Sequence, residues 1–188
     1  MSSIYEVSSL NNILHKLPEK FVSETLSSFS CKRDKDVEFF LKEKAIVQEK
    51  KHISRTYLIF TTEPVRELVA YFTIDVNSTD GNSLQCSNSL QKKMNIHNNT
   101  AQSYLIGQLG KRDGSEKGLG KFALYSAINL IRSANLIVGC RLIRLDCRPS
   151  LEGYYADNEF MFARRNKNND LSQMVRIIDV QPLPSAVA

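Results

Sequence analysis

The segment from Lys111 to Lys121 holds the residues of this chain that are best suited to binding a phosphate. It lies between two apolar segments, and Gly118 and Gly120 stand directly before the second one. Backbone N–H groups at the start of a helix lack partners within that helix, and the helix dipole is positive there, which suits a phosphate or pyrophosphate. Glycine lets a ligand approach the backbone closely, and Lys117 adds positive charge. We therefore expect an anionic cofactor at this loop.

Two common phosphate-binding patterns are absent from the loop. A nucleotide hydrolase requires GxxxxGK[ST], whereas Gly114 is followed four positions later by Gly118 and then by Leu119. A dinucleotide-binding fold requires GxGxxG, and no third glycine follows Gly120 at that spacing. Neither nucleotide hydrolysis nor hydride transfer is expected, and a turn that only starts a helix is the alternative to a cofactor loop.

Periodicity predicts the elements that position this loop. A strand is expected over 103–110 and an amphipathic helix over 119–134, so the loop joins a strand to a helix. The other expected elements are a short helix around 13–17, an edge strand around 21–26, a helix over 35–50 capped by Asp34 or Asp36, an antiparallel hairpin of strands 57–60 and 68–76, a polar connection over 77–102 with a helical turn at 90–94, a strand over 141–147, a short helix over 151–158, and strands over 159–165 and 174–180.

Composition indicates an ordinary globular chain. With 188 residues, 42% hydrophobic and 24% charged, it has the size and composition of one packed domain. No apolar run approaches the length of a membrane span, and the first residues lack a secretion-signal pattern, so we expect a cytoplasmic protein without a membrane partner. The net charge of +5 favours an anionic partner such as a phosphate-bearing cofactor or RNA.

The cysteines predict neither a metal site nor a disulfide framework. Cys31, Cys86, Cys140 and Cys147 show no paired metal-ligand spacing, so we interpret them as reduced thiols and expect no metal.

The segment SYLIGQLGKRDGSEKGLGKFAL (103–124) resembles the central motif of the GNAT acetyltransferase superfamily. The resemblance implies one α/β (α+β) domain over 1–188, with residues 1–25 an unassigned N-terminal extension. It implies a mixed, mostly antiparallel central sheet that is splayed at the cofactor site and flanked by helices. It also implies that acetyl-CoA is bound, with its pyrophosphate on the loop amides. The implied cofactor-binding residues are Lys117, Gly118, Leu119, Gly120 and Lys121 in the loop, and Leu109, Gly110 and Lys111 at the end of the preceding strand.

A second motif of the family is similar to RLIRLDCRPSLEGYYADNEFMF (141–162). The resemblance gives Tyr155 the role of general acid, which donates a proton to the departing coenzyme A thiolate. A phenol with a pKa near 10 is protonated at neutral pH and can do this. Tyr154 is expected to pack on the core, and Glu159 with Phe160 stands where Gly-Phe is common.

Further segments resemble the toxin branch of the GNAT enzymes, which acetylates the amino group of aminoacyl-tRNA. These segments are Phe29-Ser30-Cys31, DVEFFLKEKA (36–45), SRTY (54–57), VAYFTID (69–75) and IGQLG (106–110). The resemblance implies an N-acetyltransferase that acts by direct attack of a primary amine. Aminoacyl-tRNA, a cognate antitoxin and a second copy of the chain are the candidate partners. A phosphate-binding surface could be lined by Lys92, Lys93, Arg112, Arg164, Arg165 and Lys167.

Two alternatives stay open from the sequence. The acceptor can instead be a small amine or a protein N-terminus, or the chain can be a non-catalytic module that binds coenzyme A or RNA. No histidine or carboxylate is singled out by position as the base that takes the proton of the amine.

Overall fold

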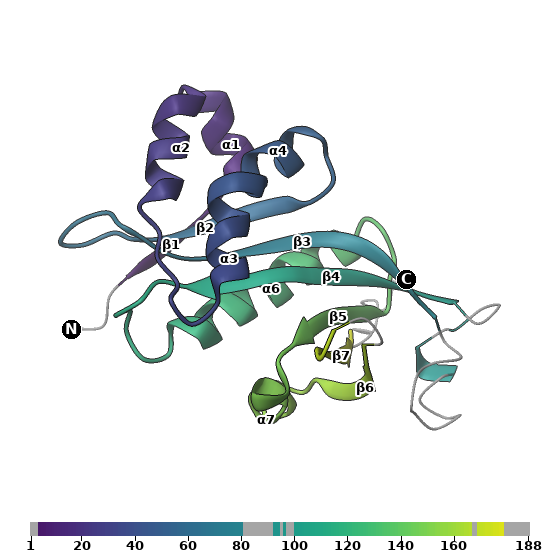
Figure 1. The fold of residues 1–188 in the computed structure, drawn as a ribbon. Helices are drawn as coiled ribbons and strands as arrows, with labels where there is room; N and C mark the ends of the chain where they lie inside the picture. The colour runs from purple at the N-terminus through teal and green to yellow at the C-terminus, as the bar shows by residue number, and fades with distance from the viewer. Residues whose placement is uncertain (1–3, 81–91, 95, 97–99, 167–168, 179–188) are drawn as a thin grey trace, which may run out of the picture. The chain divides into compact units, whose positions relative to one another are not determined.

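The computed structural model describes residues 4–80, 92–94, 96, 100–166 and 169–178. Seven strands form a mixed, mostly antiparallel sheet in the order β1-β2-β3-β4-β5-β7-β6, flanked by helices (Figure 1). This confirms the predicted α/β fold class. The chain divides into two compact units, Met1–Val76 with Tyr104–Ala134, and Asn77–Ser103 with Asn135–Ala188, and each is described by itself. The expectation of a single domain stays a prediction.

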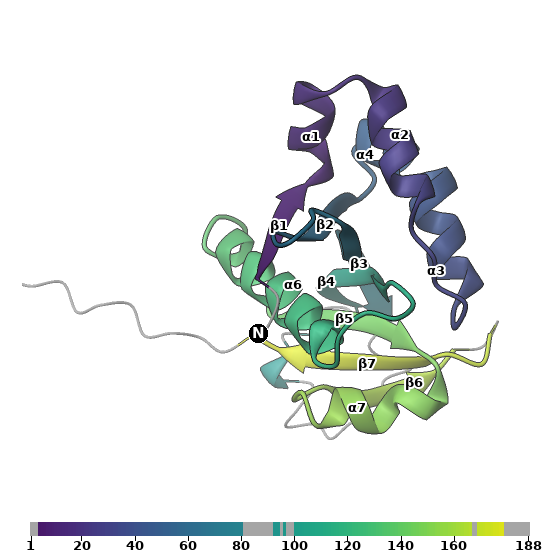
Figure 2. The ribbon, with the colours of Figure 1, turned by 90° about the vertical axis from the view of Figure 1, so that its left-hand side faces the viewer.

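The first unit contains an antiparallel arrangement of β1, β2 and β3 with helices on both faces. Helices α1 to α4 cover one face of these strands and α6 lies on the other (Figure 2). The elements are β1 (Tyr5–Ser9), α1 (Leu10–Lys16), α2 (Glu19–Ser27), α3 (Lys35–Phe39), the π-helical turn η1 (Phe40–Lys44), α4 (Ala45–Lys50), β2 (Arg55–Thr61), the first part of β3 (Leu68–Asp80), the last part of β4 (Thr100–Lys111) and α6 (Leu119–Asn135).

The predicted hairpin and the predicted helices over 35–50 and 119–134 are confirmed, whereas the N-terminal predictions are partly wrong. The edge strand expected at 21–26 is helix α2, because Val22 and Leu26 lie one helical turn apart and both are buried. The edge strand of the sheet is β1, which the sequence analysis did not identify. Asp34 caps α3, since its carboxylate accepts a hydrogen bond from the Val37 amide at 3.3 Å.

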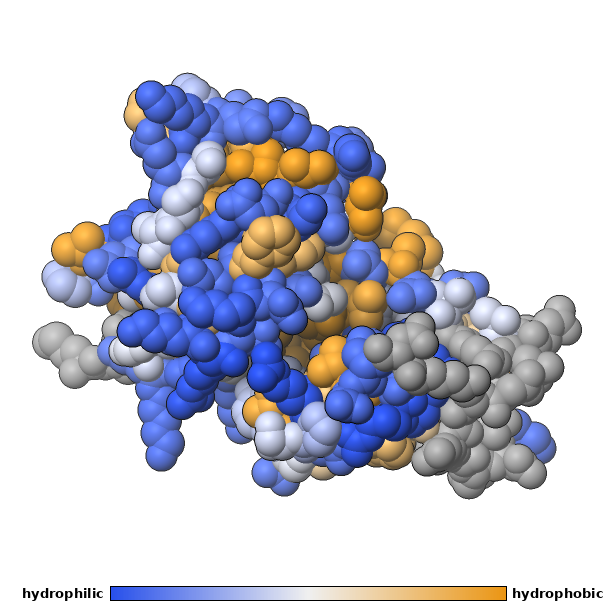
Figure 3. Space-filling model, in the orientation of Figure 1, coloured by the Kyte–Doolittle hydropathy of each residue, from blue (hydrophilic) through white to orange (hydrophobic). Residues whose placement is uncertain are grey.

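Apolar side chains of the helices and strands form the core of the first unit. Leu26, Leu41 and Tyr71 are 0% exposed and belong to one cluster. The Tyr71 hydroxyl donates to the Val37 carbonyl at 2.6 Å, which ties β3 to α3. Hydrophilic residues cover most of the face on which α2 and α3 lie, with apolar residues in small areas between them (Figure 3). The helices therefore bury one stripe and expose the other.

The second unit is built on three antiparallel strands. Strand β7 (Ser172–Ile177) pairs with β5 (Leu142–Cys147) on one side and with β6 (Met161–Arg165) on the other. The turn η3 (Pro149–Leu151) and helix α7 (Glu152–Ala156) connect β5 to β6. The predicted elements over 141–178 are thus confirmed to within a few residues at most ends, and residues 179 and 180 of the last predicted strand lie outside the described residues.

The connection predicted over 77–102 is shorter than expected. Strand β3 continues to Asp80 and β4 begins at Thr100, so both ends of the segment are strand. Residues 92 and 93 are helical and residue 94 is in a turn, in line with the predicted turn at 90–94, whereas residues 90 and 91 lie outside the described residues. None of the helices in the described ranges combines the length and apolar content that a membrane crossing requires.

Candidate functional site

The first half of the loop between β4 and α6 is fastened to the rest of the first unit. The Arg112 amide donates to the Val69 carbonyl at 2.7 Å, and the Asp113 amide donates to the Ser30 carbonyl at 2.9 Å. Both carboxylate oxygens of Asp113 accept from the Lys32 amide at 3.1 Å. The loop is therefore held from two directions, by β3 and by the segment that precedes α3.

The second half of the loop leaves its backbone donors open. No described residue accepts a hydrogen bond from the amides of Lys117, Gly118, Gly120 or Lys121. The first amide to enter the helical ladder is that of Phe122, which donates to the Gly118 carbonyl at 3.0 Å. Helix α6 has 17 residues, so these open amides coincide with the positive end of a long helix dipole. This arrangement suits an anion with several oxygen acceptors.

Gly118 is required by the backbone at this point. Its φ is +97°, a conformation that L side chains rarely adopt, and nothing lies within 4 Å of the place where a Cβ would be. The residue therefore combines a turn that only glycine makes easily with open space above the backbone. Lys117 and Lys121 flank it as the sequence predicted, and Lys121 lies 5.7 Å from the Tyr125 ring centroid.

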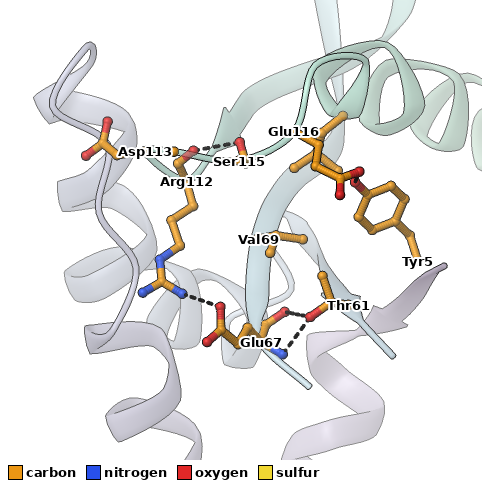
Figure 4. A pocket seen from close by; sticks show the side chains of 10 residues that line it. Tyr5, Thr61, Glu67, Val69, Arg112, Asp113, Ser115 and Glu116 are labelled. Carbon is orange, nitrogen blue, oxygen red and sulfur yellow. Dashed lines mark hydrogen bonds and ion pairs between the residues drawn. The ribbon is translucent and has the colours of Figure 1, made fainter. Parts of the chain in front are cut away.

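A pocket of about 290 Å³ lies beside the first half of the loop (Figure 4). Charged side chains of its lining have partners in the protein: Arg112 pairs with Glu67 at 3.1 Å, and Glu116 accepts a hydrogen bond from the Tyr5 hydroxyl at 3.1 Å. The pocket is thus lined by side chains that already have partners, whereas the second half of the loop presents backbone amides without acceptors among the described residues. Its lining residues are Tyr5, Thr61, Glu67, Val69, Arg112, Asp113, Gly114, Ser115, Glu116 and Leu119.

The end of β4 contains Leu109, Gly110 and Lys111, the other predicted cofactor contacts. A Cβ at Gly110 would lie 2.4 Å from Val37 Cγ1 of α3 and 2.9 Å from Tyr71 Cε1 of β3, so a side chain here would force these neighbours to shift. Packing alone therefore favours glycine at this position. Leu109 and Lys111 are half-buried.

Tyr155 lies in the second unit, on helix α7, and is 7% exposed. Its ring makes edge contacts with the rings of Tyr154 and Phe160, at centroid distances of 5.1 and 5.8 Å. Burial raises the pKa of the Tyr155 phenol above its usual value, because a phenolate would lose its hydration. The phenol is therefore protonated across the neutral range.

The C-terminal end of α7 has the hydrogen bonds of a Schellman cap. The Glu159 amide donates to the Ala156 carbonyl and the Phe160 amide to the Tyr155 carbonyl, both at 3.0 Å. Glu159 has φ +66°, the left-handed conformation for which glycine is the usual residue. The sequence shows glutamate where Gly-Phe is common, but nothing in the local pattern predicted the left-handed conformation.

The arginines proposed as a phosphate-binding surface already have protein partners. Arg112 pairs with Glu67, Arg164 donates to Gln173 at 2.9 Å, and Arg165 donates to Ser172 at 2.7 Å. Lys92 and Lys93 are exposed, and Lys167 lies outside the described residues.

The described cysteines and carboxylates form no metal site. Cys31, Cys140 and Cys147 are free thiols, and Cys86 lies outside the described residues. In the part of the chain that the structure describes, no group of three histidine, cysteine or carboxylate side chains is placed to hold a metal ion.

Comparison with solved structures finds full-length matches, although no protein-family model and no curated protein matches the chain. The crystal structure of a tyrosine-to-phenylalanine variant of KacT matches with TM-score 0.72 and 19% identity, over 92% of this chain and 94% of that one. AtaT complexed with acetyl-methionyl-tRNAfMet matches with TM-score 0.71 and 20% identity, over 90% and 94%. AtaTR bound with AcCoA matches with TM-score 0.64 and 18% identity, over 92% and 93%. Over nearly its whole length, the chain therefore has the fold of the GNAT toxins KacT and AtaT.

Proposed function

We propose that the protein is an acetyl-CoA-dependent N-acetyltransferase. The observation that carries the proposal is the group of four open amides at the start of α6, beside Gly118. Such donors suit the pyrophosphate of coenzyme A, with Lys117, Gly118, Gly120 and Lys121 as its contacts. Leu119, the other predicted contact, already donates its amide to the Glu116 carbonyl at 3.4 Å and would contribute its position in the turn. The likeness to a structure of AtaTR with AcCoA supports this choice of anion.

In the proposed reaction, the neutral amine of the acceptor attacks the thioester carbonyl directly. The new C–N bond forms as the C–S bond breaks, and a backbone amide at Leu109 or Gly110 stabilises the negative charge on the carbonyl oxygen. Tyr155 gives its proton to the departing thiolate, and water takes the proton that the amine loses. Holding amine and thioester together supplies much of the rate, because it replaces an improbable encounter.

The acceptor that we propose is the α-amino group of an aminoacyl-tRNA. The likeness to AtaT complexed with acetyl-methionyl-tRNAfMet and the net charge of +5 support this substrate class. An α-amino group next to an ester has a low pKa, so it needs no side-chain base. The related AtaT structure with the C-terminus of the antitoxin AtaR makes an antitoxin the expected protein partner.

The test is acetyl transfer from labelled acetyl-CoA to charged tRNA, small amines and peptides, with the parent chain and two variants. Tyr155→Phe should lower kcat by roughly 10²- to 10⁴-fold while coenzyme A still binds in calorimetry, because it removes only the proton donor. Tyr154→Phe, on the same helix, is the matched control and should retain activity.

Each contrary result identifies a different error. Coenzyme A binding without turnover on any acceptor would leave a non-catalytic binding module. Turnover on small amines or peptides but not on charged tRNA would replace the acceptor. Harmless expression of an active enzyme would count against a toxin, whereas growth arrest that is relieved by Tyr155→Phe would support one.

A further inference from the structure

A closed group of three side chains holds the start of helix α7. The Ser172 hydroxyl donates to the Glu152 carboxylate, and Arg165 pairs with the same carboxylate at 3.2 Å. Arg165 also donates to the Ser172 hydroxyl at 2.7 Å, so each member contacts the other two. Ser172 is 0% exposed. The first residue of α7 is thereby joined to β6 and β7.

A second group holds the other end of the helix. Arg176 donates to the Asn158 carbonyl at 3.0 Å and pairs with the Glu159 carboxylate. The Asn158 side-chain amide donates to the Tyr154 carbonyl at 2.7 Å, which returns to the last turn of α7. Arg176 is 6% exposed and comes from β7. Both ends of α7 are thus attached to the same central strand of the second unit.

Tyr155 lies between these two attachments. The contacts of its own ring are not sufficient to fix the direction of its phenol. Helix α7 has only five residues, so it cannot be stable by its own hydrogen bonds and needs tertiary partners. The Tyr155 ring makes edge contacts with the rings of Tyr154 and Phe160, and these are ring contacts rather than hydrogen bonds to the Tyr155 hydroxyl. The direction of the phenol therefore depends on where the helix backbone is fixed.

We propose that Glu152 is a positioning residue for the Tyr155 phenol, acting through Ser172 and Arg165. The proposal rests on the proposed function, in which Tyr155 is the proton donor. Proton transfer tolerates only small errors in direction, so release of one helix end should lower the rate of the chemical step without weakening cofactor binding.

The experiment is a double-mutant cycle with Glu152→Gln and Tyr155→Phe. Glu152→Gln keeps the size of the side chain and removes the charge that pairs with Arg165. It should lower kcat about 10-fold and leave the KM for acetyl-CoA within about twofold, as expected for a misplaced catalytic group. In the Tyr155→Phe background the same change should alter kcat by less than about twofold, because no proton donor is left to misplace.

Two further variants keep the cycle interpretable. Ser172→Ala removes the other contact of the Glu152 carboxylate and should lower kcat in the same way. It serves as the test if Glu152→Gln does not fold. Glu19→Gln breaks an exposed ion pair with Lys50 in the first unit and should leave both kinetic constants unchanged. Circular dichroism and a melting curve for each variant separate misplacement from unfolding.

The two hypotheses fail in different ways. If Tyr155→Phe retains full activity, the assignment of the proton donor fails. If Tyr155→Phe is impaired but Glu152→Gln and Ser172→Ala are not, or if the kcat losses multiply in the double variants, Glu152 has only a structural role and the positioning proposal is overturned.

Discussion

The loop before α6 and the helix α7 differ in whether their polar groups have partners within the protein. In the loop, the amides of Lys117, Gly118, Gly120 and Lys121 have no acceptor among the described residues. Around α7, charged and hydroxyl side chains are joined to one another at both ends of the helix. A ligand site must leave donors for the ligand, whereas a group that transfers a proton must itself be held. The difference separates a region suited to binding from one suited to positioning.

The largest expected effect on cofactor binding comes from changing the backbone at the open half of the loop. Gly118→Ala places a Cβ at φ +97°, so the backbone must shift and the amides must turn from their present directions. A lost charge-assisted hydrogen bond costs about 1.5–3 kcal/mol, so coenzyme A affinity should fall roughly 10- to 100-fold. Isothermal titration calorimetry with coenzyme A measures this.

Gly139→Ala is the control for that variant, because Gly139 has open space and no positive φ. It should bind coenzyme A as the parent does. Equal affinity of the parent and Gly118→Ala would mean that the loop is only a turn that begins a helix.

A smaller effect is expected from loosening the fastened half of the loop. Asp113→Ala removes the acceptor of the Lys32 amide and leaves the open amides in place. Loss of a hydrogen bond worth about 1 kcal/mol should raise the KM for acetyl-CoA about fivefold and leave kcat unchanged. Steady-state kinetics check this, with Asp36→Ala, an exposed carboxylate in α3, as the control; a fall in kcat alone would contradict it.

The smallest effect concerns the cap of α7. Glu159→Ala keeps the left-handed strain and leaves the buried Arg176 without its carboxylate, whereas Glu159→Gly also relieves the strain. Glu159→Gly should therefore be more stable than Glu159→Ala by about 1 kcal/mol. Urea unfolding of both variants measures the difference, and equal midpoints would show that the conformation at 159 costs nothing.

Periodic segments were predictable from the sequence because the spacing of their own apolar side chains determines whether they form a helix or a strand. The helix over 35–50 and the strands of the hairpin bury residues at regular spacing, so local patterns are sufficient. The same reasoning failed at 21–26, where the helical pair Val22 and Leu26 is interrupted by polar residues. Strand β1 has only five residues and its burial hardly alternates, so it gave no period to detect.

The candidate site was predictable where glycine marks a special backbone and not where distant residues meet. Gly118 and Gly120 indicated the loop directly. The fastening of Asp113 to Lys32 joins residues 81 positions apart, and the group around Glu152 joins α7 to two later strands. Such contacts depend on the tertiary fold, so no local pattern in the sequence predicts them.

The close approach of α3 to β4 at Gly110 changes how variation at this position should be interpreted. Any other residue would displace Val37 or Tyr71, whether or not the protein transfers an acetyl group. A library selected only for folding should therefore retain glycine at 110 while accepting many replacements at 139. Invariance at position 110 would report steric exclusion, and it should not be counted in favour of catalysis.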